Sequence, residues 1–533
     1  MGQDRPLSLA ALKARNGAPK IMTKTVTVSK APVPVPKPQS RPASKIPASP
    51  RKTVANGHAR PTSAPRNSTT PSSLPSRQSS KEPLERLKQE RRNRVKRPSP
   101  ALSTPNFTSS DDESDDEQPR KRARITPEEE IDKNRKIRDL KSFSQPDDDA
   151  LPMVHAFDIA NNEIIELSRD KYQPFFTALQ GDEEECPTVE LQYPSACQRE
   201  KYQLVRPSDS SDFKPLSEIE DNMKIVAGFY LDEKSASLVT SEEDGSGFVQ
   251  QLHRQATLGL KGRVGAQSRY CEVVDRYNKL ITEKQQDGTI AKKLDEMVRV
   301  DIKLVEHIIK DQVYARTVSP QVHLVRDYES FSDNVYGELL PKFLSRIFKE
   351  THLKSDQVFV DLGSGVGNCV LQAALEVGCE SWGCEMMENP NTLAQLQATE
   401  FPARCRLWGI KPGKVRLIHG DFLKNEDVKK VLKRADVILV NNQAFTAELN
   451  DKLKYVFLDL KEGAQIVSLK PFRSPAHKIK ESNVNDPINV LEVVEKERWS
   501  GMVSWSDDPG KWYHQTKHSR ALEKFFKRLG QGT

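Results

Sequence analysis

A glycine-rich turn preceded by an acidic residue is the segment best suited to chemistry. It reads Val358-Phe-Val-Asp361-Leu-Gly363-Ser-Gly365-Val-Gly367-Asn368. Glycine lets the backbone bend tightly and approach a ligand without a Cβ clash. A dinucleotide loop has the spacing GxGxxG and offers helix amides to a pyrophosphate, whereas this loop is GxGxG. Because Asp361 adds a carboxylate, the segment predicts a site for a positively charged sulfonium amino acid; the alternative is a purely structural turn.

Two further carboxylates end the strands expected next along the chain. Glu385 lies 24 residues after Asp361, at the place where a carboxylate can accept both hydroxyls of a ribose. Asp421 follows the third strand, where it can meet an adenine amino group while Phe422 covers the ring. Any one of these acids would usually be a surface charge. Together, the three predict a site for an adenosyl ligand that carries a sulfonium group.

The fourth expected strand ends in amides and an aromatic residue, Val440-Asn441-Asn442-Gln443-Ala444-Phe445. An amide can align an amine lone pair, and aromatic rings attract a cationic methyl group. The alternative is an Asx-type turn that closes the strand. A lysine acceptor must first become neutral, which costs about 4 kcal/mol at neutral pH, and a narrow apolar channel favours the neutral form. Positioning then suffices, without a covalent enzyme intermediate.

Strands and helices alternate from about residue 335 to the C-terminus. The predicted strands are Val358–Val360, Glu380–Cys384, Val415–His419, Val437–Val440 and Ala464–Leu469. The predicted helices are Leu339–Lys349, Asn368–Glu376, Thr392–Arg404, Glu426–Arg434 and Glu448–Leu460. This alternation predicts an α/β fold with a doubly wound sheet and a ligand at the carboxyl ends of its strands.

A different pattern precedes the α/β region. Strand-like segments at Val189–Tyr193 and Tyr202–Val205 are broken by turn residues. From Gly247 to Arg316, apolar residues recur at three- and four-residue spacing, which predicts two or more helices. The sequence does not indicate what these helices do.

The N-terminal part is basic and rich in Pro and Ser. Residues 1–110 carry 22 Lys and Arg against 4 Asp and Glu, a net charge of +18, so the rest of the +7 chain has a net charge of −11. Large apolar residues are too few to offset the ordering entropy, which predicts a disordered tail over residues 1–150. The tail includes a basic segment at Glu82–Lys96, an acidic run at Asp111–Glu117 and a nuclear-localisation-like cluster at Arg120–Arg124. Such arms usually contact polyanions, although a solvated charge run with no specific role is the alternative.

Cysteine spacing and hydropathy narrow the class of protein. The seven cysteines form no CxxC pair, so reduced thiols in a nuclear or cytosolic protein are expected. No apolar run approaches the roughly 18–20 residues of a membrane span. We therefore expect no structural metal and no membrane association.

Four segments together resemble the disruptor-of-telomeric-silencing family, the histone lysine methyltransferases without a SET domain. They are Asn334-Val-Tyr336-Gly337-Glu338-Leu-Leu-Pro341, the loop Asp361–Asn368, Val440–Phe445 and Ser468-Leu-Lys-Pro-Phe472. The resemblance covers roughly residues 300–515, and more loosely 190–300, in the manner of the fungal members. It implies a class I, Rossmann-like, seven-strand methyltransferase domain over residues 317–533, a mainly helical lobe over 190–316 and the basic tail.

The resemblance also implies the cofactor S-adenosyl-L-methionine and a set of site residues. Those that match the cofactor pocket are Tyr328, Glu329, Tyr336, Gly337, Glu338, Asp361, Gly363, Gly365, Asn368, Glu385, Asp421 and Phe422. Those that match the methyl-transfer end and the lysine channel are Asn441, Tyr336, Phe445 and, as the aromatic channel wall, Trp512 or Tyr513. The sequence departs from the family pattern at Gln443, where an aromatic is frequent, and at Trp512, where a tyrosine is common.

As partners and roles, the resemblance implies a nucleosome substrate methylated at the lysine at position seventy-nine of histone H3. It further implies contacts with the histone H4 tail and ubiquitylated histone H2B, DNA contact by the basic tail, a monomer in the nucleus, and roles in chromatin silencing and the DNA-damage response. Two other readings stay open on the residues alone. One is a methyltransferase for RNA, a small molecule or another protein with the same cofactor pocket, and the other is a non-catalytic chromatin-binding module.

Overall fold

The computed structural model describes residues 132–143, 151–161, 171–176, 187–325 and 337–530. The expected disordered tail and its basic clusters lie outside these residues, apart from a short segment at 132–143. That segment contacts the rest of the protein: Arg135 donates to the Leu375 and Lys411 carbonyls at 3.1 and 2.7 Å, and Ile137 is buried. These contacts fall within the span predicted as the tail, residues 1–150.

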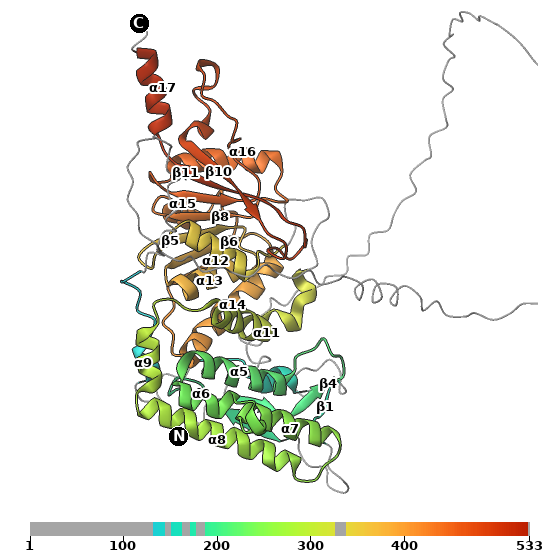
Figure 1. Ribbon diagram of the computed structural model, residues 1–533. Coiled ribbons are helices and arrows are strands. Elements are labelled where there is room, and N and C mark those ends of the chain that lie inside the picture. Colours follow the sequence, from blue (N-terminus) through green and yellow to red (C-terminus); the bar gives the residue numbers. More distant parts are fainter. Residues whose placement is uncertain (1–131, 144–150, 162–170, 177–186, 326–336, 531–533) are drawn as a thin grey trace, which may run out of the picture. The chain divides into compact units, whose positions relative to one another are not determined.

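A seven-stranded sheet forms the C-terminal part of the described chain (Figure 1). Its strands are β5 (Val358–Leu362), β6 (Glu380–Glu385), β7 (Val415–His419), β8 (Val437–Val440), β9 (Gln465–Ser468), β10 (Leu491–Arg498) and β11 (Gly510–Lys517). The order across the sheet is β10-β11-β9-β8-β5-β6-β7. Strand β11 runs in the opposite direction to the other six, which are parallel to one another. This is the doubly wound α/β arrangement that the sequence predicted, with the order reversing between β5 and β8.

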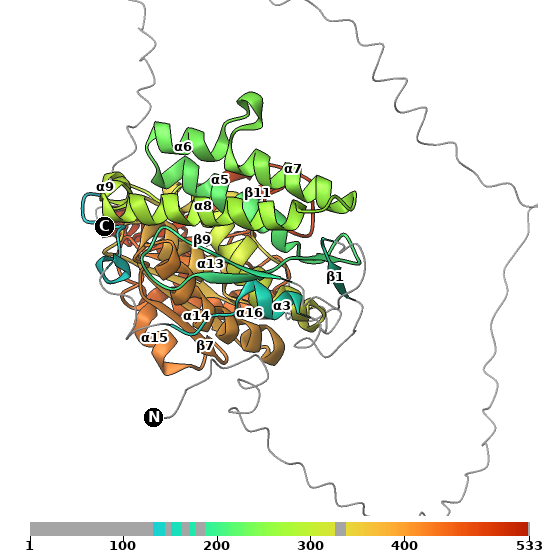
Figure 2. The same ribbon diagram turned by 90° about the horizontal axis from the view of Figure 1, so that it is seen from below.

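Helices cover both faces of this sheet (Figure 2). They are α12 (Pro341–Glu350), α13 (Asn368–Gln372) continued by the π-helical turn η5 (Ala373–Val377), α14 (Glu388–Leu407), α15 (Glu426–Leu432), and α16 (Ala447–Val456) followed by η6 (Phe457–Asp459). Because side chains alternate along a strand, Val360 of β5 packs with the α15–α16 side, while Phe359 packs with Phe343 and Phe348 of α12. The C-terminal helix α17 (Arg520–Gly530) has no buried residue.

The lobe before the sheet is mainly helical. It contains α3 (Ala156–Ala160), α5 (Pro215–Tyr230), α6 (Glu233–Thr240), η2 (Glu243–Gly245), α7 (Phe248–Leu260), α8 (Ala266–Gln286), α9 (Thr289–Glu296), α10 (Ile302–Glu306), the π-helix η3 (His307–Tyr314), α11 (Ala315–Thr317) and η4 (Ser319–Val325). Two strand pairs accompany them: β1 (Tyr172–Pro174) with β4 (Val205–Pro207), and β2 (Thr188–Leu191) with β3 (Glu200–Gln203). A short 3-10 turn, η1 (Leu140–Phe143), precedes them. The sequence analysis began its helical pattern at Gly247 and so missed α5 and α6.

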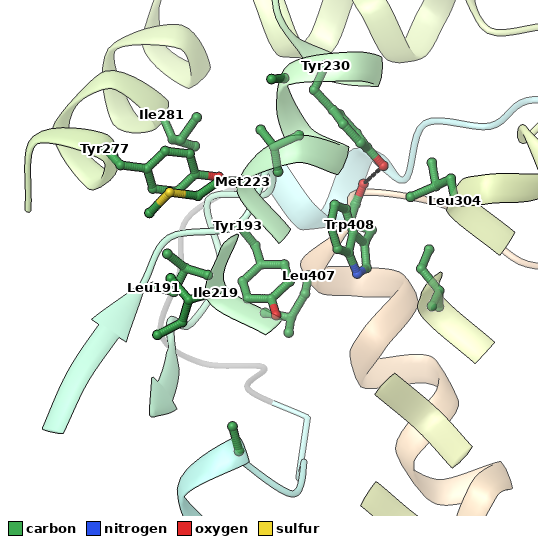
Figure 3. Packing of buried hydrophobic residues seen from close by; sticks show 14 of the residues in the cluster. Leu191, Tyr193, Ile219, Met223, Tyr230, Tyr277, Ile281, Leu304, Leu407 and Trp408 are labelled. Carbon is green, nitrogen blue, oxygen red and sulfur yellow. Dashed lines mark hydrogen bonds between the residues drawn. The ribbon is translucent and has the colours of Figure 1, made fainter. Parts of the chain in front are cut away.

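One hydrophobic core joins the lobe to the sheet domain. Trp408, at the end of α14, is fully buried among lobe residues, and Tyr193 meets its ring edge-on at 5.1 Å between centroids. Tyr230 of α5 donates its hydroxyl to the Trp408 carbonyl at 3.0 Å, the dashed contact in Figure 3. Ile219 and Met223 of α5 pack in the same cluster (Figure 3). The two parts therefore share a single packed interior.

Buried charges cross the same junction. Arg316 of α11 donates to Glu200 of β3 at 2.9 Å and to both carboxylate oxygens of Glu218 of α5. Arg404 of α14 donates to Glu200 and to Glu400, both at 2.6 Å. All five side chains are within a few per cent of full burial, so each charge depends on its partners rather than on water. We call these five residues the junction network.

No helix in the described part of the chain combines the length and the apolar composition needed to cross a membrane.

Candidate functional site

A cavity of about 510 Å³ lies at the carboxyl ends of the central parallel strands. Of the residues predicted to form the site, it is lined by Gly337, Glu338, Gly363, Gly365, Asn368, Glu385, Asp421, Phe422, Asn441 and Phe445. These residues come from five separated segments, and the sheet brings them together because parallel strands end at a common edge. The sequence analysis missed several lining residues, among them Leu324, Val325, Met387, Pro390, Leu449 and Lys452. These are ordinary loop and helix residues with no motif to mark them.

The glycine-rich loop wraps one wall of the cavity. Gly363, Gly365 and Gly367 all have positive φ values, of 86°, 55° and 91°, a region that other residues rarely adopt. Glu385, at the end of β6, accepts hydrogen bonds from the amides of Gly365 and Met387, both at 2.8 Å. The carboxylate of Glu385 therefore holds the loop while also lining the cavity.

Asp361 is the most electrostatically unusual residue of the site. Its side chain is almost completely buried, and it is not itself among the residues that line the cavity. Burial raises the pKa of Asp361 to about 8; the nearby Glu385 adds to this rise and a hydrogen bond with Cys369 opposes it. Within the described ranges, neither Asp361 nor Glu385 forms an ion pair with a Lys or Arg side chain. The loop and the end of β6 thus bring together two carboxyl groups that have no Lys or Arg ion-pair partner among the described residues.

The end of β7 contributes a carboxylate and an aromatic ring. Asp421 is partly exposed and pairs with Lys424 at 2.9 Å. The rings of Phe422 and Phe445 stack at 6.3 Å between centroids, with an interplanar angle of 27°. Phe445, predicted at the methyl-transfer end, therefore lies next to Phe422, which was predicted to cover the adenine ring.

Asn441, at the end of β8, presents an unused acceptor. Its Nδ2 donates to the Gly337 carbonyl at 3.0 Å. Its Oδ1 is buried and has no hydrogen-bond partner among the described residues. Since a buried polar atom left alone costs free energy, this oxygen suits a donor supplied by a ligand or substrate. The next residue, Asn442, is fully buried and accepts from the amides of Leu469 and Lys470, so it ties β8 to β9.

Trp512 does not occupy the position expected for a channel wall. It is fully buried on β11, packs edge-on against Phe343 and donates its indole N–H to the Glu497 carbonyl at 3.3 Å. The tryptophan beside the cavity is Trp505, which is 40% exposed; a Cβ placed on Gly337 would lie 2.6 Å from its ring. The structure therefore favours a packing role for Trp512, because its strand face points to the α12 core.

Tyr328, Glu329 and Tyr336 lie outside the described residues. Gln443, the other departure from the family pattern, is exposed and does not line the cavity. No cluster of potential metal ligands occurs in the portions of the chain that are described.

Comparison with known proteins places this cavity in a family. The family model described as "Histone methylation protein DOT1" matches residues 314–517. The chain is 48% identical over 465 residues to the "Histone-lysine N-methyltransferase, H3 lysine-79 specific" of Aspergillus fumigatus, covering 86% of this chain and 88% of that protein. The chain belongs to the DOT1 family.

Further DOT1 relatives support the same assignment. A protein of Gibberella zeae with the same name is 44% identical over 392 residues, which cover 73% of this chain and 74% of that protein.

Among solved structures, an RNA methyltransferase of Salinibacter ruber in complex with S-adenosyl-L-homocysteine shares 18% identity, covers 34% of this chain and 94% of that one, and has a TM-score of 0.23. The DOT1 match at 314–517 contains the whole seven-stranded sheet and all of the residues that line the cavity.

Proposed function

We propose that this protein transfers methyl groups from S-adenosyl-L-methionine to a histone lysine, the residue named in its relatives as H3 lysine-79. The proposal is carried by two features at the carboxyl ends of the strands: a pair of carboxyl groups, of which Glu385 lines the cavity and Asp361 is buried outside its lining, and the amide of Asn441. Asp361 and Glu385 form a carboxylate pair that no described cation balances, and Asn441 has a buried amide oxygen with no partner. The first suits a cationic methyl donor and the second suits an incoming amine.

The residues present fit such a donor. Glu385 can accept the ribose hydroxyls, Asp421 the adenine amino group, and the stacked rings of Phe422 and Phe445 offer an apolar face. Asp361 supplies negative charge beside the positive-φ glycines, where the backbone can approach a ligand closely. When bound, the donor supplies an electrophilic methyl group. Cation binding also stabilises the ionised form of Asp361, which burial otherwise disfavours.

The chain's own residues then act by placing the amine. A lysine must be neutral to attack, and a dry aromatic environment lowers the pKa of an ammonium group. The Asn441 Oδ1 can accept one N–H of this amine and so orient its lone pair. Trp505, packed against Gly337, provides an aromatic surface next to Asn441. No nucleophilic side chain is required, because alignment of amine and methyl group supplies the main catalytic effect.

We further propose that the substrate is the assembled nucleosome, within the nucleus. The net charge of +18 over residues 1–110 supports contact between the basic tail and DNA. Helix α17 supports a protein contact: Phe526 and Leu529 are exposed, 52% and 38%, on a helix that buries nothing. The protein partners we propose are ubiquitylated histone H2B and the histone H4 tail. The protein would act as a monomer, in chromatin silencing and in the DNA-damage response.

The decisive experiment offers labelled S-adenosyl-L-methionine with intact nucleosomes, free histones or RNA as acceptors. We expect label on histone H3 of nucleosomes, located by mass spectrometry at one lysine. Label on RNA or on another protein would replace the proposed substrate, and nucleosome binding without any transfer would favour a non-catalytic chromatin module.

Replacing Asn441 with alanine tests the methyl-transfer end. Asn441→Ala removes the amine acceptor, and we expect turnover on nucleosomes to fall roughly 100-fold through lost alignment, with donor affinity nearly unchanged. The measurements are single-turnover methylation and calorimetric binding of the donor. The neighbouring exposed variant Gln443→Ala is the matched control and should keep both values. An equal loss of donor affinity would mean that Asn441 belongs to the donor pocket instead.

Deleting residues 1–130 tests the basic tail. We expect donor affinity to be retained, while nucleosome binding weakens and its dependence on salt becomes shallower. Each lost phosphate contact should reduce the log–log slope by about 0.9. Nucleosome affinity measured across a salt series checks this, and an unchanged slope would assign DNA binding to another part of the chain.

A further inference from the structure

Gln397 of α14 is a fully buried polar residue that faces the back of the glycine-rich loop. Its Nε2 donates to the Val366 carbonyl at 2.6 Å and to the Asn368 Oδ1 at 2.9 Å. Its Oε1 is buried without a hydrogen-bond partner among the described residues. Gln397 does not line the cavity, so its polar contacts serve the residues that do.

The contact to Asn368 continues into the cavity wall. Asn368 donates from Nδ2 to Glu338 Oε1 at 3.3 Å. Asn368 and Glu338 line both the cavity described above and a second cavity of about 450 Å³ between η3, α5 and the start of α12. The pair Asn368–Glu338 is therefore the wall that the two cavities share.

Acceptor-only groups at both ends set the direction of this chain of hydrogen bonds. The Val366 carbonyl and the Glu338 carboxylate can only accept, so the amide nitrogens of Gln397 and Asn368 must face them. Gln397 then has its second N–H left for the Asn368 oxygen, which turns the Asn368 NH₂ group toward Glu338. Without Gln397, the Asn368 amide could rotate by half a turn and present its oxygen instead.

We propose that Gln397 is a positioning residue that fixes the Asn368 amide with its N–H groups toward the cavity, where they bind the carboxylate of the donor's amino-acid part. The inference rests on the proposed function, because it assigns one subsite of the donor cavity. The cost of the unpartnered Gln397 oxygen is consistent with a polarity that the site requires, since an apolar residue would leave no such atom.

Two ligands separate this role from general support of the loop. S-Adenosyl-L-homocysteine carries the amino-acid carboxylate, and methylthioadenosine lacks it. The variant Gln397→Met keeps the side-chain volume but removes the N–H groups that donate hydrogen bonds. For this variant we expect roughly tenfold weaker binding of S-adenosyl-L-homocysteine, as for one lost charge-assisted hydrogen bond. Binding of methylthioadenosine should stay within about twofold, which also reports that the variant is folded.

A double-mutant cycle tests whether Gln397 acts through Asn368. Asn368→Ala should cause a similar loss, and adding Gln397→Met to it should cause no further loss. Gln397→Glu, which keeps the shape but offers acceptors to the Asn368 amide, should also weaken S-adenosyl-L-homocysteine selectively. The matched control is Gln395→Met, an exposed glutamine on the same helix, which should leave both affinities unchanged.

Calorimetry on the full-length protein gives distinct outcomes. Equal weakening of both ligands by Gln397→Met, or losses that multiply in the double variant, would overturn the positioning role. If the wild-type protein bound neither ligand, the proposed methyl-donor site itself would fail. Tight wild-type binding with no effect of any Gln397 variant would leave the proposed function standing and remove only this inference.

Discussion

Buried carboxylates occur in two regions of this protein, and their surroundings are opposite. In the junction network, Glu200, Glu218 and Glu400 lie among Arg316 and Arg404, with nitrogen–oxygen distances of 2.6–2.9 Å. At the glycine-rich loop, the buried Asp361 and the cavity-lining Glu385 have no Lys or Arg side chain as an ion-pair partner in the described chain. An uncompensated buried charge is costly. The acids paired with arginines therefore suit a structural role, and the acids without such partners suit binding of a cationic ligand.

The pKa shifts of Glu200 and Asp361 show this contrast, although burial raises the pKa of Glu218 even within the junction network. Burial by itself would raise the pKa of Glu200, but Arg404 and Arg316 hold it far below its ordinary value. Burial raises the pKa of Asp361 to about 8, and no arginine in the described ranges is among the groups that oppose the rise. The arginines therefore favour the ionised form of Glu200 in the folded protein, whereas ionisation of Asp361 would be favoured by a cationic ligand.

The largest expected effect comes from breaking the junction network. Arg404→Met leaves Glu200 and Glu400 buried without their main partner, and we expect the free energy of unfolding to fall by about 3–5 kcal/mol. Urea denaturation followed by circular dichroism measures this change. The matched control is Arg434→Met, because Arg434 pairs with Glu380 at a partly exposed site, where an ion pair contributes less than about 1 kcal/mol. Equal losses in both variants would erase the contrast between buried and exposed pairs.

In contrast to Arg404→Met, the variant Asp361→Asn should raise the free energy of unfolding. The folded-state pKa of about 8 lies above the ordinary value of 3.8, so between these values the folded protein holds a proton that the unfolded chain has released. Wild-type stability therefore falls as the pH rises through this window, by at most about 1.4 kcal/mol per pH unit. Since the variant does not titrate, its advantage should grow from pH 5 to pH 8 and level off above.

Donor binding supplies the second half of the Asp361 test. We expect Asp361→Asn to gain stability at pH 8 and yet to lose calorimetric binding of the methyl donor, because the balancing negative charge is gone. Unfolding at several pH values and titration of the donor measure the two properties separately. A variant that lost both stability and binding would place Asp361 with the structural acids of the junction.

The difference between the two regions also governs what the sequence could predict. The strands β5 to β9 were predicted because each is a short apolar run bounded by turns, and the acids at their ends follow from the parallel topology. The strands β10 and β11 were missed. Strand β10 reads Leu-Glu-Val-Val-Glu-Lys-Glu-Arg, mostly exposed at the sheet edge, so its pairing with β11 rather than its hydropathy makes it a strand.

The other features that the sequence could not predict depend on contacts between residues far apart in the chain. Trp505 and Trp512 are both aromatic residues near the end of the chain, and only the pairing of Tyr513 with Ser468 determines that Trp512 faces the core. The junction network was equally invisible, since Glu200 and Arg404 are more than two hundred positions apart. Acids that serve a ligand thus carry a local motif, whereas acids that hold the fold reveal themselves only through contacts between distant segments.

Asp421 offers the finest test of the comparison, because it belongs to the cavity and yet has a lysine partner. Burial favours a raised pKa for Asp421, but hydrogen bonds from Lys424 and the Leu423 amide hold it below the ordinary value. Lys424 is 85% exposed, so Lys424→Met should change stability by less than about 1 kcal/mol and donor affinity by less than roughly threefold. Unfolding curves and donor titrations check both. A loss as large as that of Arg404→Met would mean that Asp421 is held as the junction acids are, and that a carboxylate lining this cavity can be structural.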